Sequence, residues 1–354
     1  MTDTAPVIVT VEGRLGRLTL NRPKALNALD LSMIRIMTKA LLSWREDEAI
    51  VGVVVDAVGE KAFCAGGDIL ALTGARKDDT STPREFYAEE YRLNTLIKEY
   101  PKPYVAMIDG IVMGGGVGIS VHGTRRICGD RTLFAMPETG IGFYPDVGGS
   151  YFLPRLEGKV GTWLALTGAR LKAADTFALG IATDYAPSDQ HREILARLVE
   201  DTIICEDVVA IVDSLTGVPG PGTVVEHKAQ IEAAFGADTV EGILDRLARD
   251  GSDWASKQIK ILQSKSPTAL KVTLRQMREG QNLDFRACMR MELGLSLKFV
   301  AGHDFTEGVR ALLVDRDNTP HWQPDSLSAV HDDMVAGYFV PLGKDESLTF
   351  LEER

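Results

Sequence analysis

The sequence lacks several features that would assign it to common classes of protein. No apolar run among the 354 residues is long enough to span a bilayer, so we expect no membrane-spanning helix. The four cysteines include no CxxC pair and the six histidines form no HExxH motif, which predicts reduced thiols and no metal site. With a formal net charge of −11, the chain has no basic excess for binding nucleic acid.

The first residues also lack a targeting pattern. Residues 1–13 show neither the basic-then-apolar layout of a secretory signal nor the Arg-rich character of a transit peptide, and their alternating apolar pattern predicts a strand instead. From these absences we expect a cytoplasmic protein without membrane or nucleic-acid partners. A homo-oligomer is compatible with the sequence.

Alternating strand and helix patterns predict an α/β fold. Apolar, β-branched runs at Ile50–Val55 and Pro103–Ile108 are typical of strands buried on both faces, and each precedes a glycine-rich turn and helical sequence. Two shorter strands are expected at Val7–Val11 and Arg17–Leu20, and the spacing from Leu29 to Trp44 predicts a helix that Asn27 and Asp30 can cap. The implied sheet is largely parallel.

Beyond about Thr167 the sequence becomes helical. The predicted helices are Ala173–Leu179, His191–Glu200, Val240–Arg249, Thr268–Glu279 and Phe285–Phe299. A loop is expected at Gly217–Gly222. We therefore predict a core at residues 1–200 and a helical C-terminal region at residues 201–354.

Two glycine-rich segments, Lys61–Ile69 and Asp109–His122, stand where a strand gives way to a helix. Exposed N–H groups in such loops can point at one oxygen, and two loops that meet form an oxyanion hole. A thioester carbonyl needs such a hole when it becomes an enolate or a tetrahedral adduct. The glycine runs fit neither the dinucleotide pattern GxGxxG nor the nucleophile elbow GxSxG, and we expect His122 to be a packed helix residue.

A third segment, Phe134–Gly149, supplies acid–base groups. Glu138 and Asp146 lie among apolar residues and glycines, where poor solvation would raise the pKa of a carboxyl and suit it to proton transfer near neutral pH. A structural role for Glu138 in capping a turn is the alternative.

These three segments, together with Asn21–Leu29 and Leu166–Asp175, resemble the crotonase (enoyl-CoA hydratase/isomerase) superfamily. The resemblance implies a ββα-spiral core with a helical C-terminal region. It also implies oxyanion donors on the backbone of Gly67 and Gly115, with Ala65 near the adenine and Lys24 near the CoA phosphates. The substrate is then a CoA ester, and no separate cofactor is expected.

Within this family the chain resembles the 3-hydroxyisobutyryl-CoA hydrolase branch, on the Pro137–Glu138 pair with Asp146 eight residues later. The branch also carries segments like Ser266–Met277, Asp304–Ala311 and Pro320–Trp322. The resemblance implies that Glu138 acts at the thioester, as nucleophile or as base for water. It implies that Asp146 binds or orients the hydroxyacyl group. It places Glu90 along the site, with a solvated helix face as the alternative for Glu90.

One departure decides between activities within the family. A hydratase has a glutamate just after its glycine triplet, and this chain has Gly118 there. We therefore expect hydrolysis of a short branched β-hydroxyacyl-CoA to free acid and CoA, as in valine breakdown. The alternatives are an enoyl-CoA hydratase or isomerase, and an acyl-CoA-binding protein without turnover.

Overall fold

The computed structural model describes residues 5–72 and 82–353, which form two compact units. The first unit contains the chain up to Asp68, Arg92–Phe134 and Arg170–Thr223; the second contains Ile69–Tyr91, Ala135–Ala169 and the chain from Val224 onward. Each unit is thus assembled from three separate stretches. The predicted division at residue 200 stays a prediction.

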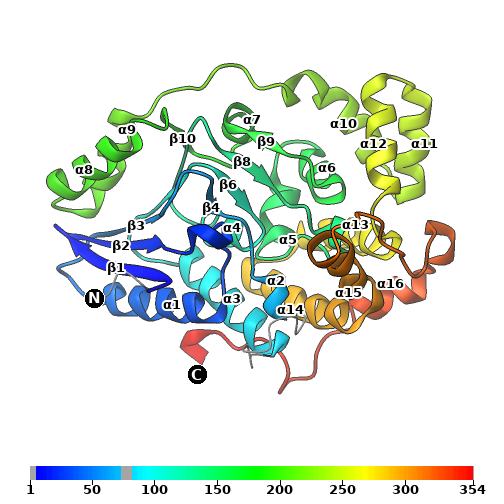
Figure 1. Cartoon of the computed structure of the whole chain (residues 1–354), viewed down its shortest axis with the longest axis horizontal. Coiled ribbons are helices and arrows are strands. Elements are labelled where there is room, and N and C mark those ends of the chain that lie inside the picture. Colours follow the sequence, from blue (N-terminus) through cyan, green and yellow to red (C-terminus); the bar gives the residue numbers. More distant parts are fainter. Residues whose placement is uncertain (1–4, 73–81, 354) are drawn as a thin grey trace. The chain divides into compact units, whose positions relative to one another are not determined.

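A six-stranded sheet organises the first unit (Figure 1), with the order β1-β2-β3-β5-β7-β10. Its strands are β1 Val7–Glu12, β2 Leu15–Leu20, β3 Gly52–Ala57, β5 Tyr104–Ile108, β7 Arg125–Cys128 and β10 Asp184–Tyr185. Only the β1–β2 pair is antiparallel, while every pairing from β2 to β10 is parallel. The predicted α/β fold with a largely parallel sheet is confirmed.

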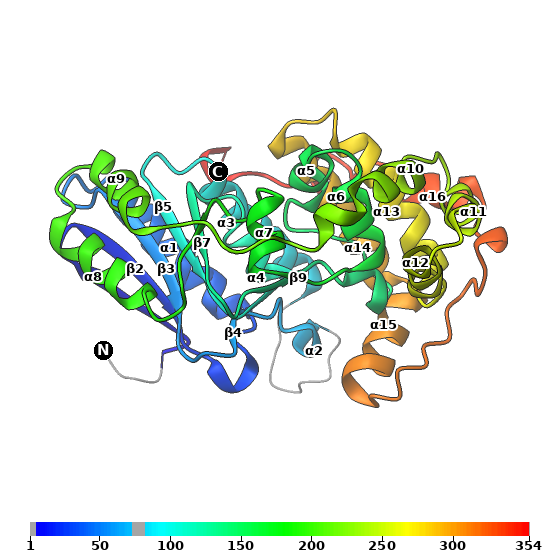
Figure 2. The ribbon, with the colours of Figure 1, turned by 90° about the horizontal axis from the view of Figure 1, so that it is seen from above.

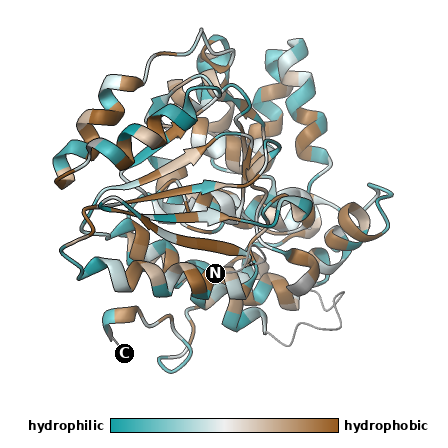
Figure 3. Ribbon diagram, turned by 60° about the vertical axis from the view of Figure 1, so that its left-hand side comes forward, coloured by the Kyte–Doolittle hydropathy of each residue, from teal (hydrophilic) through white to brown (hydrophobic). Residues whose placement is uncertain are grey.

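Helix α1 (Leu31–Arg45) follows the predicted periodicity, because Met33, Ile34, Met37 and Leu41 recur on one buried face. The capping prediction is half right. Asp30 is the N-cap and accepts a hydrogen bond from the Met33 N–H at 3.0 Å. Asn27 instead donates to the carbonyls of Val58 and Ala62. Figure 3 shows the corresponding hydrophobic and hydrophilic sides on the helices.

Helices α8 (His191–Asp201) and α9 (Cys205–Leu215) lie side by side in Figure 1 and Figure 2. Their apolar residues, including Ile194, Leu198, Val208 and Val212, join sheet residues such as Val54 in one buried cluster. This burial explains why α8 forms where His191–Glu200 was predicted. Helix α7 (Ala173–Ala178) also begins where predicted.

A second, four-stranded sheet has the order β4-β6-β8-β9. Its strands are β4 Ala62–Cys64, β6 Ile111–Met113, β8 Leu133–Ala135 and β9 Leu171–Lys172. Strands β4 and β6 run parallel, so their carboxyl ends emerge at the same edge. The short helix α4 (Gly115–Gly118) starts at that edge, and the 3₁₀ turn η1 (Pro23–Ala25) belongs to the same unit.

The second unit is helical. Its longer helices are the first half of α3 (Pro83–Lys98), α6 Val160–Thr167, α10 Lys228–Phe235, α11 Val240–Asp250, α12 Asp253–Gln263, α13 Pro267–Gly280 and α14 Phe285–Ala301. Its shorter helical elements are α2 Ile69–Leu72, η2 Glu138–Ile141, α5 Gly149–Phe152, η3 Leu153–Arg155, η4 Val224–His227, α15 His303–Val309, η5 Arg310–Val314, η6 Leu327–Ala329, α16 Asp332–Tyr338 and η7 Leu351–Glu353.

The helices predicted at Val240–Arg249, Thr268–Glu279 and Phe285–Phe299 are confirmed as α11, α13 and α14. Side-chain caps fix where they begin, because Thr239, Ser266 and Asp284 each accept a hydrogen bond from a backbone N–H of the first turn. Within the ranges that the structure describes, no helix is both long and apolar enough to cross a membrane.

Candidate active site

The two glycine-rich loops of the first unit lie against each other. They follow the parallel strands β4 and β6, and they contain residues with positive φ, Gly66 at 121° and Gly114 at 46°. A Cβ added to Gly116 would lie only 2.3 Å from the Cys64 carbonyl oxygen. A side chain there would push the loops apart, so glycine is required for this close approach.

The backbone hydrogen bonds that hold the two loops do not use the N–H groups of Gly67 and Gly115, which are the predicted oxyanion donors. Leu29 bridges the β4 loop by donating to the Gly66 carbonyl at 2.8 Å and accepting from the Asp68 N–H at 2.7 Å. These bonds use the groups on either side of Gly67 and leave the N–H of Gly67 itself aside. Gly115 is the first residue of α4, where a helical N–H has no partner within the helix.

The predicted CoA-contacting residues lie on neighbouring loops of the same unit. The Ala65 N–H donates to the Leu26 carbonyl at 3.1 Å, which joins the loop after β4 to the turn that carries the exposed Lys24. Arg22 pairs with Asp30 and Asp68 at 3.3 and 2.9 Å and so ties both loops to the start of α1. Lys24, Ala65 and Gly67 are thus held in one small region.

The second unit contains a cluster of four buried carboxyl groups. Glu90 comes from α3, Glu138 begins η2, Asp146 precedes α5 and Glu292 lies in α14, and none is more than 7% exposed. The alternative of a solvated helix face for Glu90 is therefore wrong. Sequence reasoning missed Glu292, because the spacing of α14 predicts a helix without saying which side faces inward.

Burial is the main cause of the raised pKa values in this cluster. It raises the pKa of Asp146 to about 7 and that of Glu292 to about 8. The pKa values of Glu90 and Glu138 are raised well above the ordinary range by burial and then by the charge of Asp146. Protons are consequently held here at pH values where exposed carboxyls have lost them.

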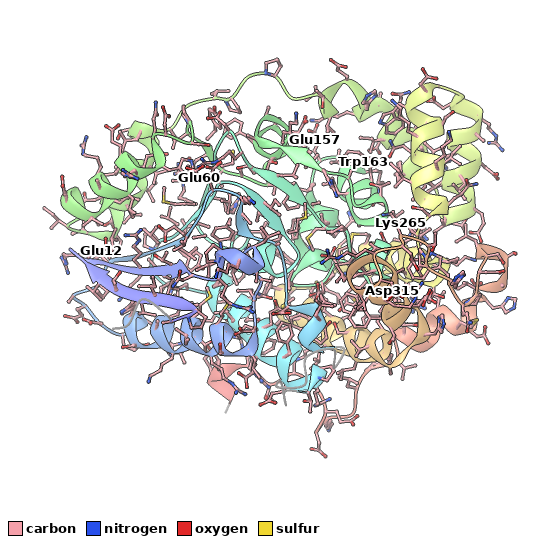
Figure 4. All side chains as sticks on the ribbon, viewed as in Figure 1. Glu12, Glu60, Glu157, Trp163, Lys265 and Asp315 are labelled. Atoms are coloured by element: carbon pink, nitrogen blue, oxygen red, sulfur yellow. The ribbon has the colours of Figure 1, made fainter. Side chains whose placement is uncertain are left out.

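Lys265 opposes this effect at Glu138. It lies in the loop between α12 and α13 (Figure 4), and its Nζ would be 3.2 Å from a Cβ placed on Gly140. Its positive charge lowers the pKa of Glu138, although less than burial raises it. The cation therefore favours the ionised carboxylate that acid–base or nucleophilic chemistry needs.

A chain of hydroxyl groups leads to Asp146. The Tyr91 hydroxyl donates to Asp146 Oδ2 at 2.7 Å and lies 2.6 Å from Ser296 Oγ. The Tyr144 hydroxyl lies 2.7 Å from the same Ser296 oxygen and donates to the Glu292 carbonyl at 2.6 Å. The Tyr91 bond fixes one face of the Asp146 carboxylate and keeps the pKa of Asp146 from rising further.

Glu292 holds the loop that follows Asp146. Its carboxyl oxygens accept from the Gly148 N–H at 2.8 Å, from the Ser150 N–H at 3.0 Å and from the Ser150 hydroxyl. Val147 and Gly148 have φ values of 50° and 88°, so this turn is strained at Val147 and depends on such support. One face of α14 thus stabilises Asp146 twice, through Glu292 and through Ser296 one turn later.

The turn at Glu138 forms without help from its side chain. The Phe143 N–H donates to the Glu138 carbonyl at 3.0 Å, and the side chain makes no capping bond. Its Oε2 atom is buried and has no hydrogen-bond partner among the described residues. A buried carboxyl oxygen of this kind is costly unless a ligand or water satisfies it, which argues against the purely structural alternative for Glu138.

Other predictions concern His122 and metals. His122 is buried as expected but lies in the turn after α4, so its assignment to a helix is wrong. Over residues 5–72 and 82–353, no group of three or more His, Cys, Asp or Glu side chains is arranged to hold a metal ion.

The sequence from residue 15 to residue 339 matches the model of the enoyl-CoA hydratase/isomerase family. The chain belongs to this family. Among its relatives, the "3-hydroxyisobutyryl-CoA hydrolase, mitochondrial" of Rattus norvegicus is 47% identical over 97% of this chain and 90% of that protein. The Homo sapiens protein of the same name is 43% identical over 98% of this chain and 91% of that protein.

Two solved structures of this family match over almost the whole chain. A carnitinyl-CoA dehydratase from Mycobacterium thermoresistibile is 40% identical, with a TM-score of 0.92, over 99% of this chain and 100% of that chain. An enoyl-CoA hydratase from Rhodobacter sphaeroides is 36% identical, with a TM-score of 0.90, over 98% and 100%. These findings confirm the predicted family, its fold and the resemblance to the hydrolase branch.

The predicted cytoplasmic location is wrong by the same comparison. The name that these relatives carry includes "mitochondrial", whereas the prediction came only from features that the sequence lacks, such as a targeting pattern in residues 1–13. A local absence in the sequence was insufficient to assign a compartment.

Proposed function

We propose that the chain hydrolyses 3-hydroxyisobutyryl-CoA to 3-hydroxyisobutyrate and CoA. The observation that carries the proposal is the pair of buried carboxyls, Glu138 and Asp146, in a family member that has Gly118 where a hydratase has its first glutamate. The relatives that share 43–47% of their residues with this chain bear the name of that activity.

In this proposal the backbone N–H groups of Gly67 and Gly115 bind the thioester oxygen. As water adds to the carbonyl carbon, the oxygen becomes negative, and each donor of this kind stabilises the adduct by about 3–4 kcal/mol. Lys24 and Ala65 hold the CoA portion, through the phosphates and the adenine. The CoA belongs to the substrate, and the proposal needs no further cofactor.

Glu138 performs the chemical step in one of two ways. As a base, it takes a proton from water while the water oxygen bonds to the carbonyl carbon; the C–S bond then breaks and the proton passes to the departing thiolate. As a nucleophile, it bonds to the same carbon, expels the thiolate and leaves an anhydride that water cleaves. Both routes require the ionised form of Glu138, which the charge of Lys265 favours.

Asp146 and Glu90 bind the acyl group. Asp146 is fixed by Tyr91 and by the loop that Glu292 holds, so its carboxylate is suited to orient a hydroxyacyl chain. A short branched hydroxyacyl group is the product of valine breakdown, and we place the chain in that pathway. A hydratase would need a second carboxyl at position 118, and an acyl-CoA-binding protein without turnover would have no use for costly buried acids.

The test compares two reactions of the purified protein. We expect thiol release from 3-hydroxyisobutyryl-CoA, or from 3-hydroxypropionyl-CoA, to be faster than hydration of crotonyl-CoA, followed at equal enzyme and ester concentrations. Dominant hydration of crotonyl-CoA would overturn the proposal in favour of a hydratase. Tight binding of the esters without either reaction would favour a binding protein.

A further inference from the structure

One face of α3 carries three buried polar side chains. Tyr87, Glu90 and Tyr91 are spaced by three and four residues, so they lie on the same side of the helix, and none is more than 2% exposed. Glu90 and Tyr91 already belong to the carboxyl cluster described above. Tyr87 extends the same face by one turn.

The ring of Tyr87 is held by aromatic packing. It stacks on Phe143 with ring centroids 5.7 Å apart, meets Phe86 edge-on at 5.5 Å and lies 5.9 Å from Tyr91. The hydroxyl end lies in the electrostatic field of Asp146, Glu90 and Glu138, which, after burial, raises the pKa of Tyr87 well above its ordinary value. The Tyr87 hydroxyl therefore stays protonated at neutral pH and can donate a hydrogen bond.

This hydroxyl is buried and has no hydrogen-bond partner among the described residues. The other two tyrosine hydroxyls of the cluster are committed, since Tyr91 donates to Asp146 and Tyr144 donates to the Glu292 carbonyl. The Oε1 atom of Glu90 is likewise buried and unpaired. An unused donor and an unused acceptor thus occur one helical turn apart, and such groups are satisfied in native proteins by a ligand or by water.

We propose that Tyr87 determines specificity for the 3-hydroxyacyl group, by donating a hydrogen bond to the 3-hydroxyl oxygen while Glu90 accepts the proton of that hydroxyl. The inference rests on the proposed function and deepens it. A hydroxyl group has one proton to give and lone pairs that accept. With the hydroxyl proton directed to Glu90 Oε1, the hydroxyl oxygen still needs a donor, and the buried Tyr87 hydroxyl, which is unpaired among the described residues, can supply it.

The same arrangement disfavours esters without the hydroxyl. Isobutyryl-CoA would bury the Tyr87 hydroxyl and the Glu90 oxygen without pairing either, and a site built to bond a hydroxyl rejects its deoxy analogue for this reason. We therefore expect the wild-type protein to prefer 3-hydroxyisobutyryl-CoA to isobutyryl-CoA in kcat/KM.

The experiment measures kcat/KM for both esters with the wild-type protein and with Tyr87→Phe. Phenylalanine keeps the stacked ring and removes only the hydroxyl. We expect Tyr87→Phe to lower kcat/KM for 3-hydroxyisobutyryl-CoA about tenfold and to change that for isobutyryl-CoA less than twofold. The matched control is Tyr100→Phe, which removes a hydroxyl bonded to the Leu41 carbonyl and should leave the ratio of the two esters unchanged.

Three results would overturn the role of Tyr87: equal losses for both esters, no loss for either, or a wild-type protein that does not discriminate between them. The last result needs no variant and so does not depend on its folding. If the wild-type protein hydrolyses neither ester, the proposed function fails separately. In that case the affinities of the wild-type protein and of Tyr87→Phe for the two esters, measured by calorimetry, test the role of Tyr87. We still expect the variant to lose affinity for 3-hydroxyisobutyryl-CoA only.

Discussion

The buried carboxyl of Glu292 predicts an unusual dependence of stability on pH. Burial raises its pKa from 4.5 to about 8, while the three donors from Gly148 and Ser150 pull in the opposite direction. Between these two pKa values the folded protein keeps a proton that the unfolded chain has lost. The free energy of unfolding therefore falls as pH rises through this window, because the native state binds more protons than the unfolded state.

The size of the effect follows from the shift. Each pKa unit corresponds to about 1.4 kcal/mol, so between pH 5 and pH 8 this one group removes about 3–4 kcal/mol of stability. Glu292→Gln removes the titration. The gap in unfolding free energy between the wild-type protein and the variant should consequently shrink by about that amount from pH 5 to pH 8, whatever the variant costs at pH 5.

Urea unfolding at pH 5, 6, 7 and 8 measures this gap. Glu279→Gln is the control, because Glu279 lies at the surface of α13 in an ion pair with Arg275, and its gap should stay within about 1 kcal/mol at every pH. A gap for Glu292→Gln that does not shrink as pH rises would show that the pKa of Glu292 is not raised in the folded protein, and would refute this reasoning. Should the variant not fold, the stability of the wild-type protein must still fall from pH 5 to pH 8.

The remaining predictions test the proposed chemistry. Glu138→Gln should lower kcat for thiol release at least 100-fold, with little loss of CoA-ester affinity in calorimetry. Glutamine keeps the shape of the side chain but neither takes a proton nor forms an acyl intermediate, so near-normal kcat would contradict the mechanism. Asp146→Asn should lower both kcat and CoA-ester affinity. It should also move the acid limb of the pH profile of kcat/KM to lower pH, because the charge of Asp146 raises the pKa of Glu138. An acid limb that does not move would argue against this coupling. Gly115→Val should abolish turnover while far-UV circular dichroism stays native, and retained activity would exclude this loop from the oxyanion hole.

Local patterns in the sequence were sufficient for much of the fold. Continuous β-branched runs predicted β3 and β5, and apolar spacing predicted α1, since each pattern reflects burial within one element. Glu138 and Asp146 could be singled out because they lie in one short segment rich in glycine and apolar residues. Single-residue details, such as the bonds of Asn27 to the Val58 and Ala62 carbonyls, depend on tertiary contacts and were not predictable.

The supporting groups of the cluster were invisible to the same reasoning. Glu292 reaches Ser150 across 142 positions, and Ser296 reaches Tyr91 across 205. No spacing rule links residues so far apart in the chain. The unpaired hydroxyl of Tyr87 was equally hidden, because an aromatic residue in a predicted helix indicates packing and says nothing of the hydrogen bonds of its hydroxyl group.

Helix α14 shows why the polar face of a helix can be misread. Glu292 and Ser296 are spaced like an ordinary solvated stripe, and by composition alone they belong on the surface. Both are fully buried. Glu292 accepts hydrogen bonds from the loop that follows Asp146, and Ser296 bonds to the Tyr91 hydroxyl, which in turn donates to Asp146. Burying them costs desolvation energy that an apolar stripe would avoid, and by the pH argument above it also costs stability near neutral pH. Polar groups are retained at that cost where a site requires them. We therefore infer that α14 supports the proposed site by holding Asp146 in place, without any of its residues contacting the substrate.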